Sequence, residues 1–170
     1  LLTSGSTTAG LLTQPGANLA NLGPTTSSSP SCASGAGYGG LTTDETAAQA
    51  GHGCVAIQYG STYVSYNYFG TDFSWVVPTD VTSVIFHALG AGGGGGRTST
   101  YYGGGGGYAT GTYAVIPGQT YSVIVGQGGS RPTSTSLSGC YYTPLTYGGG
   151  GRGGSCQSGG SSSAWQGSGG

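Results

Sequence analysis

Side chains that commonly act as acids, bases, nucleophiles or metal ligands are scarce in this sequence. It has four cysteines, two histidines and four carboxylates in 170 residues. The spacings between successive cysteines are 22, 86 and 16 positions, whereas structural zinc sites usually include a pair only two to four residues apart. No metal site is therefore expected. Four cysteines allow three disulfide pairings, and proximity in sequence favours two bonds: Cys32–Cys54 and Cys140–Cys156.

The histidines and carboxylates do not form a catalytic pattern. His52 lies two residues before Cys54, and a Cys–His pair can act as nucleophile and base, but a disulfide at Cys54 would remove the thiol. His87 falls within an apolar strand pattern, which is typical of a core or interface histidine. Asp44 and Glu45 are adjacent at the start of a helix-like stretch, where carboxylates usually stabilise the helix end. The chain is expected not to be an enzyme and to need no cofactor.

The elements that position these residues are expected to be short strands. Gly60-Ser61 predicts a hairpin turn, and Pro117-Gly118 predicts a turn between the last two strands. The one helix candidate covers residues 42–51, with a capping-box spacing at its start and a glycine at its end. The pattern predicts an all-β fold, an antiparallel β-sandwich, from alternating runs at 55–59, 62–68, 73–77, 81–89, 108–116 and 120–125.

Composition excludes several classes of partner. Only seven residues are charged, three of them Arg and none Lys, so the chain lacks the basic patch that nucleic-acid binding needs. No apolar run approaches the roughly 20 residues of a membrane-spanning helix. An even number of cysteines in a nearly neutral, lysine-free chain is typical of secreted proteins. We therefore expect an extracellular or cell-surface location.

Forty glycines are concentrated in runs, at 92–96, 103–107, 148–151 and 153–154. An isolated glycine run is costly to order and is flexible by default. The alternative is a set of packed polyglycine-II helices, which have three residues per turn and no internal hydrogen bonds. Several such helices can bond to one another, because only glycine allows their backbones to approach closely. Several separate runs in one small domain favour this ordered arrangement.

The sequence divides into an extended low-complexity arm, residues 1–31, and a glycine-rich domain, residues 32–170. The arm has no charge and no sustained periodicity, which is compatible with a flexible linker. Its leucines are unusual for a linker, and an isolated strand gains stability by joining a sheet, so the arm is also a candidate for pairing with a neighbouring subunit. The arm holds two copies of one triplet, ten residues apart: Leu1, Leu2, Thr3 and Leu11, Leu12, Thr13.

Two further groups of side chains are candidates for contacts with sugars or partners. A Ser/Thr run before Pro30 is of the kind that carries O-glycans: Thr25, Thr26, Ser27, Ser28 and Ser29. Pairs of tyrosines beside the glycine runs are predicted to lie in loops, where aromatic residues suit interfaces, although internal packing is an equal alternative: Tyr101, Tyr102, Tyr141 and Tyr142.

The order of motifs from residue 70 to 170 resembles the glycine-rich domain of secreted bacterial and phage-tail proteins. It is also similar to the extracellular glycine-rich domain of the anaplastic lymphoma kinase receptor family. The shared features are a strand ending in Val77-Pro78, a strand running into the 92–96 glycines, the 103–107 run and a P-G-x-x-Y-x-V-x-V-G-x-G-G hairpin over 117–129. The resemblance implies a jelly-roll-like β-sandwich carrying polyglycine-II helices, and roles in adhesion, fibres or receptor binding.

Three functional hypotheses follow. The leading one is a structural subunit of an extracellular filament, a homopolymer that assembles head to tail when the arm adds a strand to the next copy. The second is a binding module at an adhesin or phage-fibre tip, where tyrosine loops and glycine helices contact a receptor or glycan. The third and most remote is a secreted hydrolase.

Overall fold

The structure, a computed structural model, describes residues 25–27, 31–33, 35–40, 50–95, 102–130, 139–142, 145–149 and 154–157. These residues form antiparallel sheets and contain no helix, as the all-β prediction requires. Accordingly, no helix in them is long and apolar enough to cross a membrane. The strands are β1 Thr25–Ser27, β2 Cys54–Tyr59, β3 Thr62–Asn67, β4 Phe73–Val76, β5 Ser83–Leu89, β6 Tyr108–Ala114, β7 Thr120–Val123, β8 Gly139–Tyr142 and β9 Gly154–Gln157.

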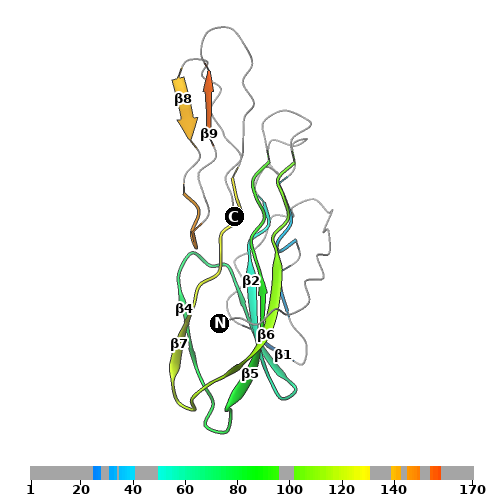
Figure 1. Cartoon of the computed structure of the whole chain (residues 1–170), viewed down its shortest axis with the longest axis vertical. Coiled ribbons are helices and arrows are strands. Elements are labelled where there is room, and N and C mark those ends of the chain that lie inside the picture. Colours follow the sequence, from blue (N-terminus) through cyan, green and yellow to red (C-terminus); the bar gives the residue numbers. More distant parts are fainter. Residues whose placement is uncertain are drawn as a thin grey trace.

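The larger sheet has five strands in the order β1-β3-β2-β5-β6 (Figure 1). Its centre is the β2–β3 hairpin, which turns at Gly60, where φ is +57° and a side chain would be strained. β5 pairs with the other side of β2, and β6 pairs with β5 from Ser83 opposite Ala114 to Leu89 opposite Tyr108. The three-residue β1 and the seven-residue β6 are thus the two edges of this sheet.

The second layer is the two-stranded β4–β7 sheet, which lies opposite the larger sheet in Figure 1. Alternation along each strand points one side chain in two toward the other layer. Ile57 and Val84 from the large sheet are buried against Trp75 and Val123 from the small one. The rings of Tyr66, Phe73 and Tyr121 extend this contact, so a sandwich forms in spite of the low content of aliphatic residues. The remaining buried core side chains, Val77, Val115 and Val125, lie just beyond strand ends.

The six predicted strands are all present, with some ends shortened, but one connection was predicted wrongly. The resemblance implied a hairpin around Pro117-Gly118. Instead, β6 pairs with β5 and β7 pairs with β4. Gly118 has φ of +77° and donates its N–H to the carbonyl of Val77. The turn therefore carries the chain from one layer to the other, because the next strand finds its partner in β4.

The predicted helix over residues 42–51 is not supported at its C-terminal end. Ala50 and Gly51 belong to no helix, and the N–H of Gly51 donates to the carbonyl of Tyr38. The rest of that prediction lies outside the described residues. β8 and β9 form a third, two-stranded sheet in which Cys140 is opposite Cys156.

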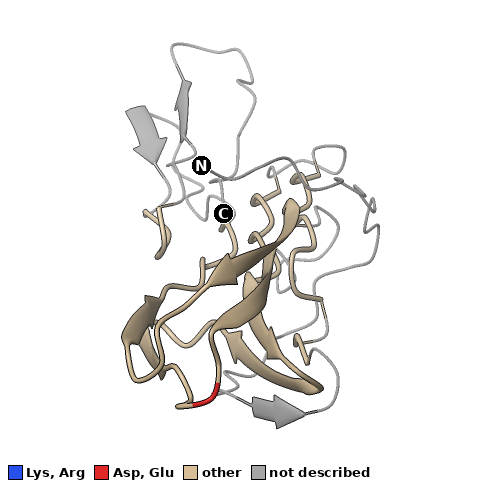
Figure 2. Cartoon of the chain, turned by 60° about the horizontal axis from the view of Figure 1, so that its bottom comes forward, with Lys and Arg blue, Asp and Glu red and all other residues tan. Residues whose placement is uncertain are grey.

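The described part of the chain is almost without charge. Its charged side chains are Asp72 and Asp80, both exposed, and Figure 2 shows no Lys or Arg on it. Within it, no group of three or more His, Cys, Asp or Glu side chains comes close enough to hold a metal ion. The surfaces of this domain therefore offer hydrogen bonds and aromatic contacts rather than ion pairs.

Candidate assembly interface

Five segments lie side by side and bond to one another through their backbones; within the first of them, residues 35–37 form a turn with φ of +80° at Gly35 and +72° at Gly37. We call them the glycine array: segment A is 35–40, B is 50–53, C is 90–95, D is 102–107 and E is 126–130. Segment C has a neighbour on several sides: the N–H of Gly92 donates to Gly51, and that of Gly93 donates to Gly104. The carbonyls of the same two glycines accept bonds from Gly129 and Gly40. Segment C thus bonds to all four other segments.

The bonds within the array repeat every third residue. The N–H groups of Gly103 and Gly106 in segment D both donate to segment A, at distances of 3.0 and 2.7 Å. Ala50 and Gly53 in segment B both donate to segment E, each at 2.9 Å. Polyglycine II has this geometry: three residues per turn, with hydrogen bonds only between neighbouring helices and none within a helix. The array therefore satisfies buried backbone groups without forming a sheet ladder.

Close approach makes glycine obligatory on the inner side of each segment. A Cβ added at Gly103 would lie 1.7 Å from the carbonyl oxygen of Gly93, and one at Gly92 would lie 2.0 Å from that of Tyr38. By contrast, a Cβ added at Gly104 meets nothing within 4 Å. The long glycine run thus contains positions that need glycine and positions that merely have it.

The sequence predicted only part of this array. The described residues of the 92–96 run and the whole 103–107 run belong to it, as expected. Of the 148–151 run, the described residues Gly148 and Gly149 have φ of +85° and +102° and lie in a turn next to segment E, where a Cβ added at Gly148 would lie 2.8 Å from the Cα of Gly126. Segments A, B and E were missed because they lack long runs. Their shared signal is a Gly-x-Gly spacing, as at Gly51 and Gly53.

His52 connects two segments of the array. Its Nδ1 accepts the N–H of Gly128 at 2.9 Å, and its ring lies 4.3 Å from that of Tyr68. Burial lowers the pKa of His52, which keeps the imidazole neutral and able to accept this bond. The predicted alternative, a Cys–His nucleophile, is absent because Cys54 forms a disulfide.

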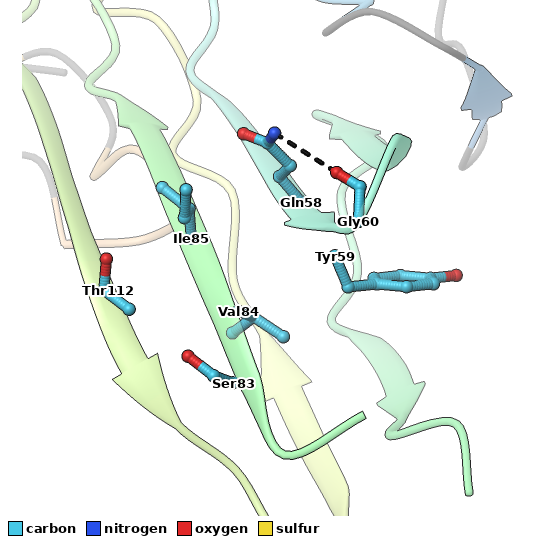
Figure 3. A pocket seen from close by; sticks show the side chains of 7 residues that line it. All are labelled: Gln58, Tyr59, Gly60, Ser83, Val84, Ile85 and Thr112. Atoms are coloured by element: carbon cyan, nitrogen blue, oxygen red, sulfur yellow. Dashed lines mark hydrogen bonds between the residues drawn. The ribbon is translucent and has the colours of Figure 1, made fainter. Parts of the chain in front are cut away.

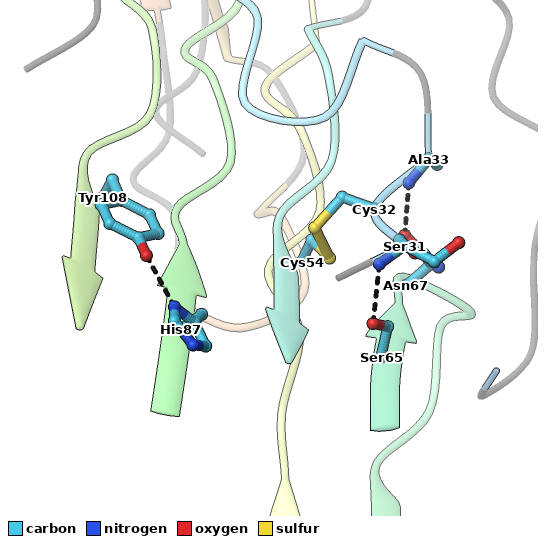
Figure 4. Close-up of a disulfide and its surroundings, with 8 residues drawn as sticks. All are labelled: Ser31, Cys32, Ala33, Cys54, Ser65, Asn67, His87 and Tyr108. Carbon is cyan, nitrogen blue, oxygen red and sulfur yellow. Dashed lines mark hydrogen bonds between the residues drawn. A yellow bond between two sulfur atoms is a disulfide. The ribbon is translucent and has the colours of Figure 1, made fainter. Parts of the chain in front are cut away.

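The base of the N-terminal arm is attached to the large sheet. Cys32 and Cys54 form one of the two disulfides that the spacing favoured (Figure 4). On either side of Cys32, the N–H of Ser31 donates to the hydroxyl of Ser65, and the N–H of Ala33 donates to the side-chain oxygen of Asn67. Ser65 and Asn67 are buried in β3, so residues 31–33 are held by both covalent and polar contacts.

The opposite edge of the same sheet is open. Every residue of β6 is exposed, and its sequence, YATGTYA, contains no charge and no proline. The N–H of Val115 donates to Thr82, and that of Gly90 donates to Gly107. Backbone groups alternate in direction along an antiparallel strand, so residues 108, 110, 112 and 114 direct theirs away from β5. Natural edge strands usually carry a Lys, Pro or bulge that prevents pairing, and β6 has no Lys or Pro.

Comparison with known protein families agrees with this architecture. The family model of the glycine-rich domain matches residues 68–170, which include β4 to β9 and three of the five array segments. The chain belongs to this glycine-rich domain family. No curated protein and no solved structure shows significant similarity to it.

The outer face of the large sheet in this glycine-rich domain carries a cluster of polar and aromatic side chains. The Nδ1 of His87 is 2.7 Å from the hydroxyl of Tyr108, and its Nε2 is 3.2 Å from the side-chain oxygen of Gln58. The ring of Tyr63 lies 5.9 Å from that of His87. Beside the cluster is a shallow pocket of about 260 Å³ between the ends of β2, β5 and β6 (Figure 3). His87 is thus on the outer face, half-buried, rather than in the core.

The remaining predicted site residues are distributed as follows. Thr25 to Ser27 form β1, which pairs with Tyr63 to Ser65 of β3. Tyr102 is 64% exposed. The prediction that Tyr141 and Tyr142 lie in a loop is wrong, because they belong to β8, where the cross-strand bonds to β9 replace loop structure. Outside the described residues lie Leu1, Leu2, Thr3, Leu11, Leu12, Thr13, Ser28, Ser29 and Tyr101.

Proposed function

We propose that this chain is a structural subunit of an extracellular filament, in which the arm of one copy adds a strand to β6 of the next. The observation that carries the proposal is the open β6 edge. It offers seven exposed, uncharged residues, four of which direct their backbone groups outward. A strand that adds there gains main-chain hydrogen bonds along its length, and an uncharged arm avoids the cost of bringing charges to the edge.

The positions of the arm and of the edge favour open assembly. The arm enters the fold at β1, and β1 and β6 are opposite edges of one sheet. A donor at one edge and an acceptor at the other make a heterologous contact, which generates a filament when the rotation does not close. The Cys32–Cys54 disulfide supports this arrangement, because it would pass tension on the arm directly to β2 at the centre of the sheet.

Other features are compatible with an extracellular polymer. A disulfide persists in oxidising compartments, and the near absence of charged side chains leaves few sites for trypsin-like proteases. The Thr25–Ser29 run would carry O-glycans, and the resemblance to secreted bacterial and phage-tail proteins favours a role in fibres or adhesion.

The test is negative-stain electron microscopy of the full chain beside two variants. Thr112 directs its N–H away from β5, so Thr112→Pro removes an outward donor without breaking the β5–β6 ladder. Filaments are expected from the wild type and from Thr112→Val, which keeps the N–H, and single particles from Thr112→Pro. Deleting residues 1–24, which leaves β1 and Cys32 in place, is expected to stop assembly as well. Single particles from the wild type would overturn the proposal.

A second candidate is the binding module at a fibre tip, which the outer-face cluster favours. The rings of Tyr63, His87 and Tyr108, with Gln58 beside them, offer stacking surfaces and hydrogen-bonding groups, which suit an uncharged glycan. If the wild type gives only single particles, glycan binding by wild type and Tyr63→Ala becomes the deciding measurement.

A further inference from the structure

Segment D is the rim of the glycine array. Its inner backbone groups bond to segments A and C. Within the described part of the chain, Gly105 makes no backbone hydrogen bond and the N–H of Gly104 has no acceptor, whereas Gly107 faces Gly90 of segment C. Gly104 and Gly105 are exposed. Among the described residues, the rim therefore has an open side with unused donors and with no side chain to keep another backbone away.

We propose that segment D binds segment D of a second copy of this chain, backbone to backbone, as an additional pair of polyglycine-II helices. The bonding is of the kind that already joins segment C to its four neighbours. Each polyglycine-II helix directs donors and acceptors to three sides, so an outer helix retains capacity for a further neighbour. The contact is isologous, because the same segment is used on both copies.

The close approach of neighbouring backbones limits which segment can bind to the open side of segment D. Within the array, a Cβ at an inner position would come within 2.0 Å of a neighbouring carbonyl, as at Gly92 and Gly103. A partner segment therefore needs glycine at each position where its backbone faces the rim. Runs of five glycines occur in this chain at 92–96 and 103–107, and the first is already surrounded by four neighbours. The second run, in another copy, is the partner that this chain itself supplies.

Two exposed aromatic residues extend the rim. Tyr102 and Tyr108 stand at its two ends and are 64% and 42% exposed. Tyrosine is enriched at protein interfaces because a large apolar ring carries a hydroxyl that can bond. The rim is only about 19 Å long at 3.1 Å per residue, so a single contact is expected to be weak. Repeated along two filaments, the same contact would hold them side by side through avidity.

The test uses the full chain carrying Thr112→Pro, which blocks pairing through β6, and measures self-association by sedimentation equilibrium. A concentration-dependent dimer is expected. Adding Gly104→Val and Gly107→Val, at positions where an added Cβ meets nothing within 4 Å, is expected to weaken the dimer at least tenfold. The matched control places two valines at Ser74 and Ser122, an exposed cross-strand pair on the small sheet, and is expected to leave the dimer unchanged.

Each outcome bears on this inference separately from the filament proposal. A monomer at all concentrations, or a dimer that survives the two rim valines, would overturn it. If the rim valines lower the melting temperature markedly, the pair Gly104→Ala and Gly107→Ala gives a milder block. If Thr112→Pro still polymerises, the proposed filament contact is wrong, and the rim variants are scored instead by the fraction of paired filaments in micrographs.

Discussion

The sandwich and the glycine array are held together by different parts of the chain. In the sandwich, Ile57 and Val84 are fully buried and pack against other apolar side chains. In the array, the contacts are between backbones, and the absence of side chains at Gly92 and Gly103 is what permits them. One region is specified by which side chains are present and the other by which are missing.

This difference explains how so few aliphatic residues support an ordered domain. The sandwich uses apolar burial and aromatic contacts, which stabilise roughly in proportion to the area removed from water. The array satisfies backbone polar groups that would otherwise cost free energy when buried, while its high glycine content carries a large entropic cost. The array is therefore expected to be the region that opens first under stress.

The largest expected effect comes from adding one methyl group inside the array. In Gly103→Ala, the new Cβ would overlap the carbonyl of Gly93, so segments C and D must separate, at a cost on the order of 4 kcal/mol. In Gly104→Ala, the adjacent change meets open space and is expected to stabilise slightly, by at most about 1 kcal/mol. Urea unfolding measures the difference. Equal midpoints for the two variants would show that the array is not packed as described.

Hydrogen exchange of Gly103→Ala and Gly104→Ala tests whether the glycine array can open while the sandwich stays folded. Gly103→Ala is expected to expose the amides of Gly93 and Gly106, which are bonded across the array, while the β2–β5 ladder retains its protection. Loss of protection throughout would mean that the array and the sandwich unfold as one unit.

The next effect concerns side-chain packing in the sandwich. Ile57 has no exposed surface, so Ile57→Ala leaves a cavity and is expected to cost about 3 kcal/mol. Val76, on the outer side of β4, is 57% exposed, and Val76→Ala is expected to cost less than about 0.5 kcal/mol. The fluorescence of Trp75, which is buried in the same core, reports the unfolding midpoints. A large loss at Val76 instead would indicate that the outer face of the small sheet is covered.

The same contrast determines what sequence could predict. Alternating apolar residues located the strands at 55–59 and 81–89, because a half-buried strand leaves a period of two in the sequence. No local signal showed that the turn at Pro117-Gly118 joins different layers, since this depends on the partner that each strand finds. In the array, long runs were detectable, whereas segments A and B contain only a few glycines placed where another backbone passes.

The candidate interface was predictable to a similar degree. The arm was recognisable by its composition, and the proximity of Cys32 to Cys54 favoured their bond. The open edge at β6 was not, because whether a strand is central or at an edge depends on sheet order, and the order β2-β5-β6 joins strands that are not consecutive.

The smallest expected effect is on pH dependence, in which the two regions should respond at opposite ends of the scale. Burial lowers the pKa of His52, so the unfolded chain binds its proton more readily, and the array loses stability as pH falls below about 6.5. Burial, and secondarily Tyr59, raises the pKa of Tyr66 to about 12. The unfolded chain then ionises first, and the sandwich loses stability as pH rises from about 10 toward 12.

Two variants isolate these groups. His52→Gln retains an oxygen that can accept the N–H of Gly128 but cannot titrate, so urea midpoints at pH 7.5 and 5.5 should differ less than in the wild type. His87→Gln, on the exposed face, is the control and should keep the full difference. Tyr66→Phe should flatten only the alkaline side. If His52→Gln instead leaves the acid response unchanged, the bond to Gly128 does not limit the stability of the array, and the comparison between its backbone contacts and the sandwich core must rest on the glycine variants alone.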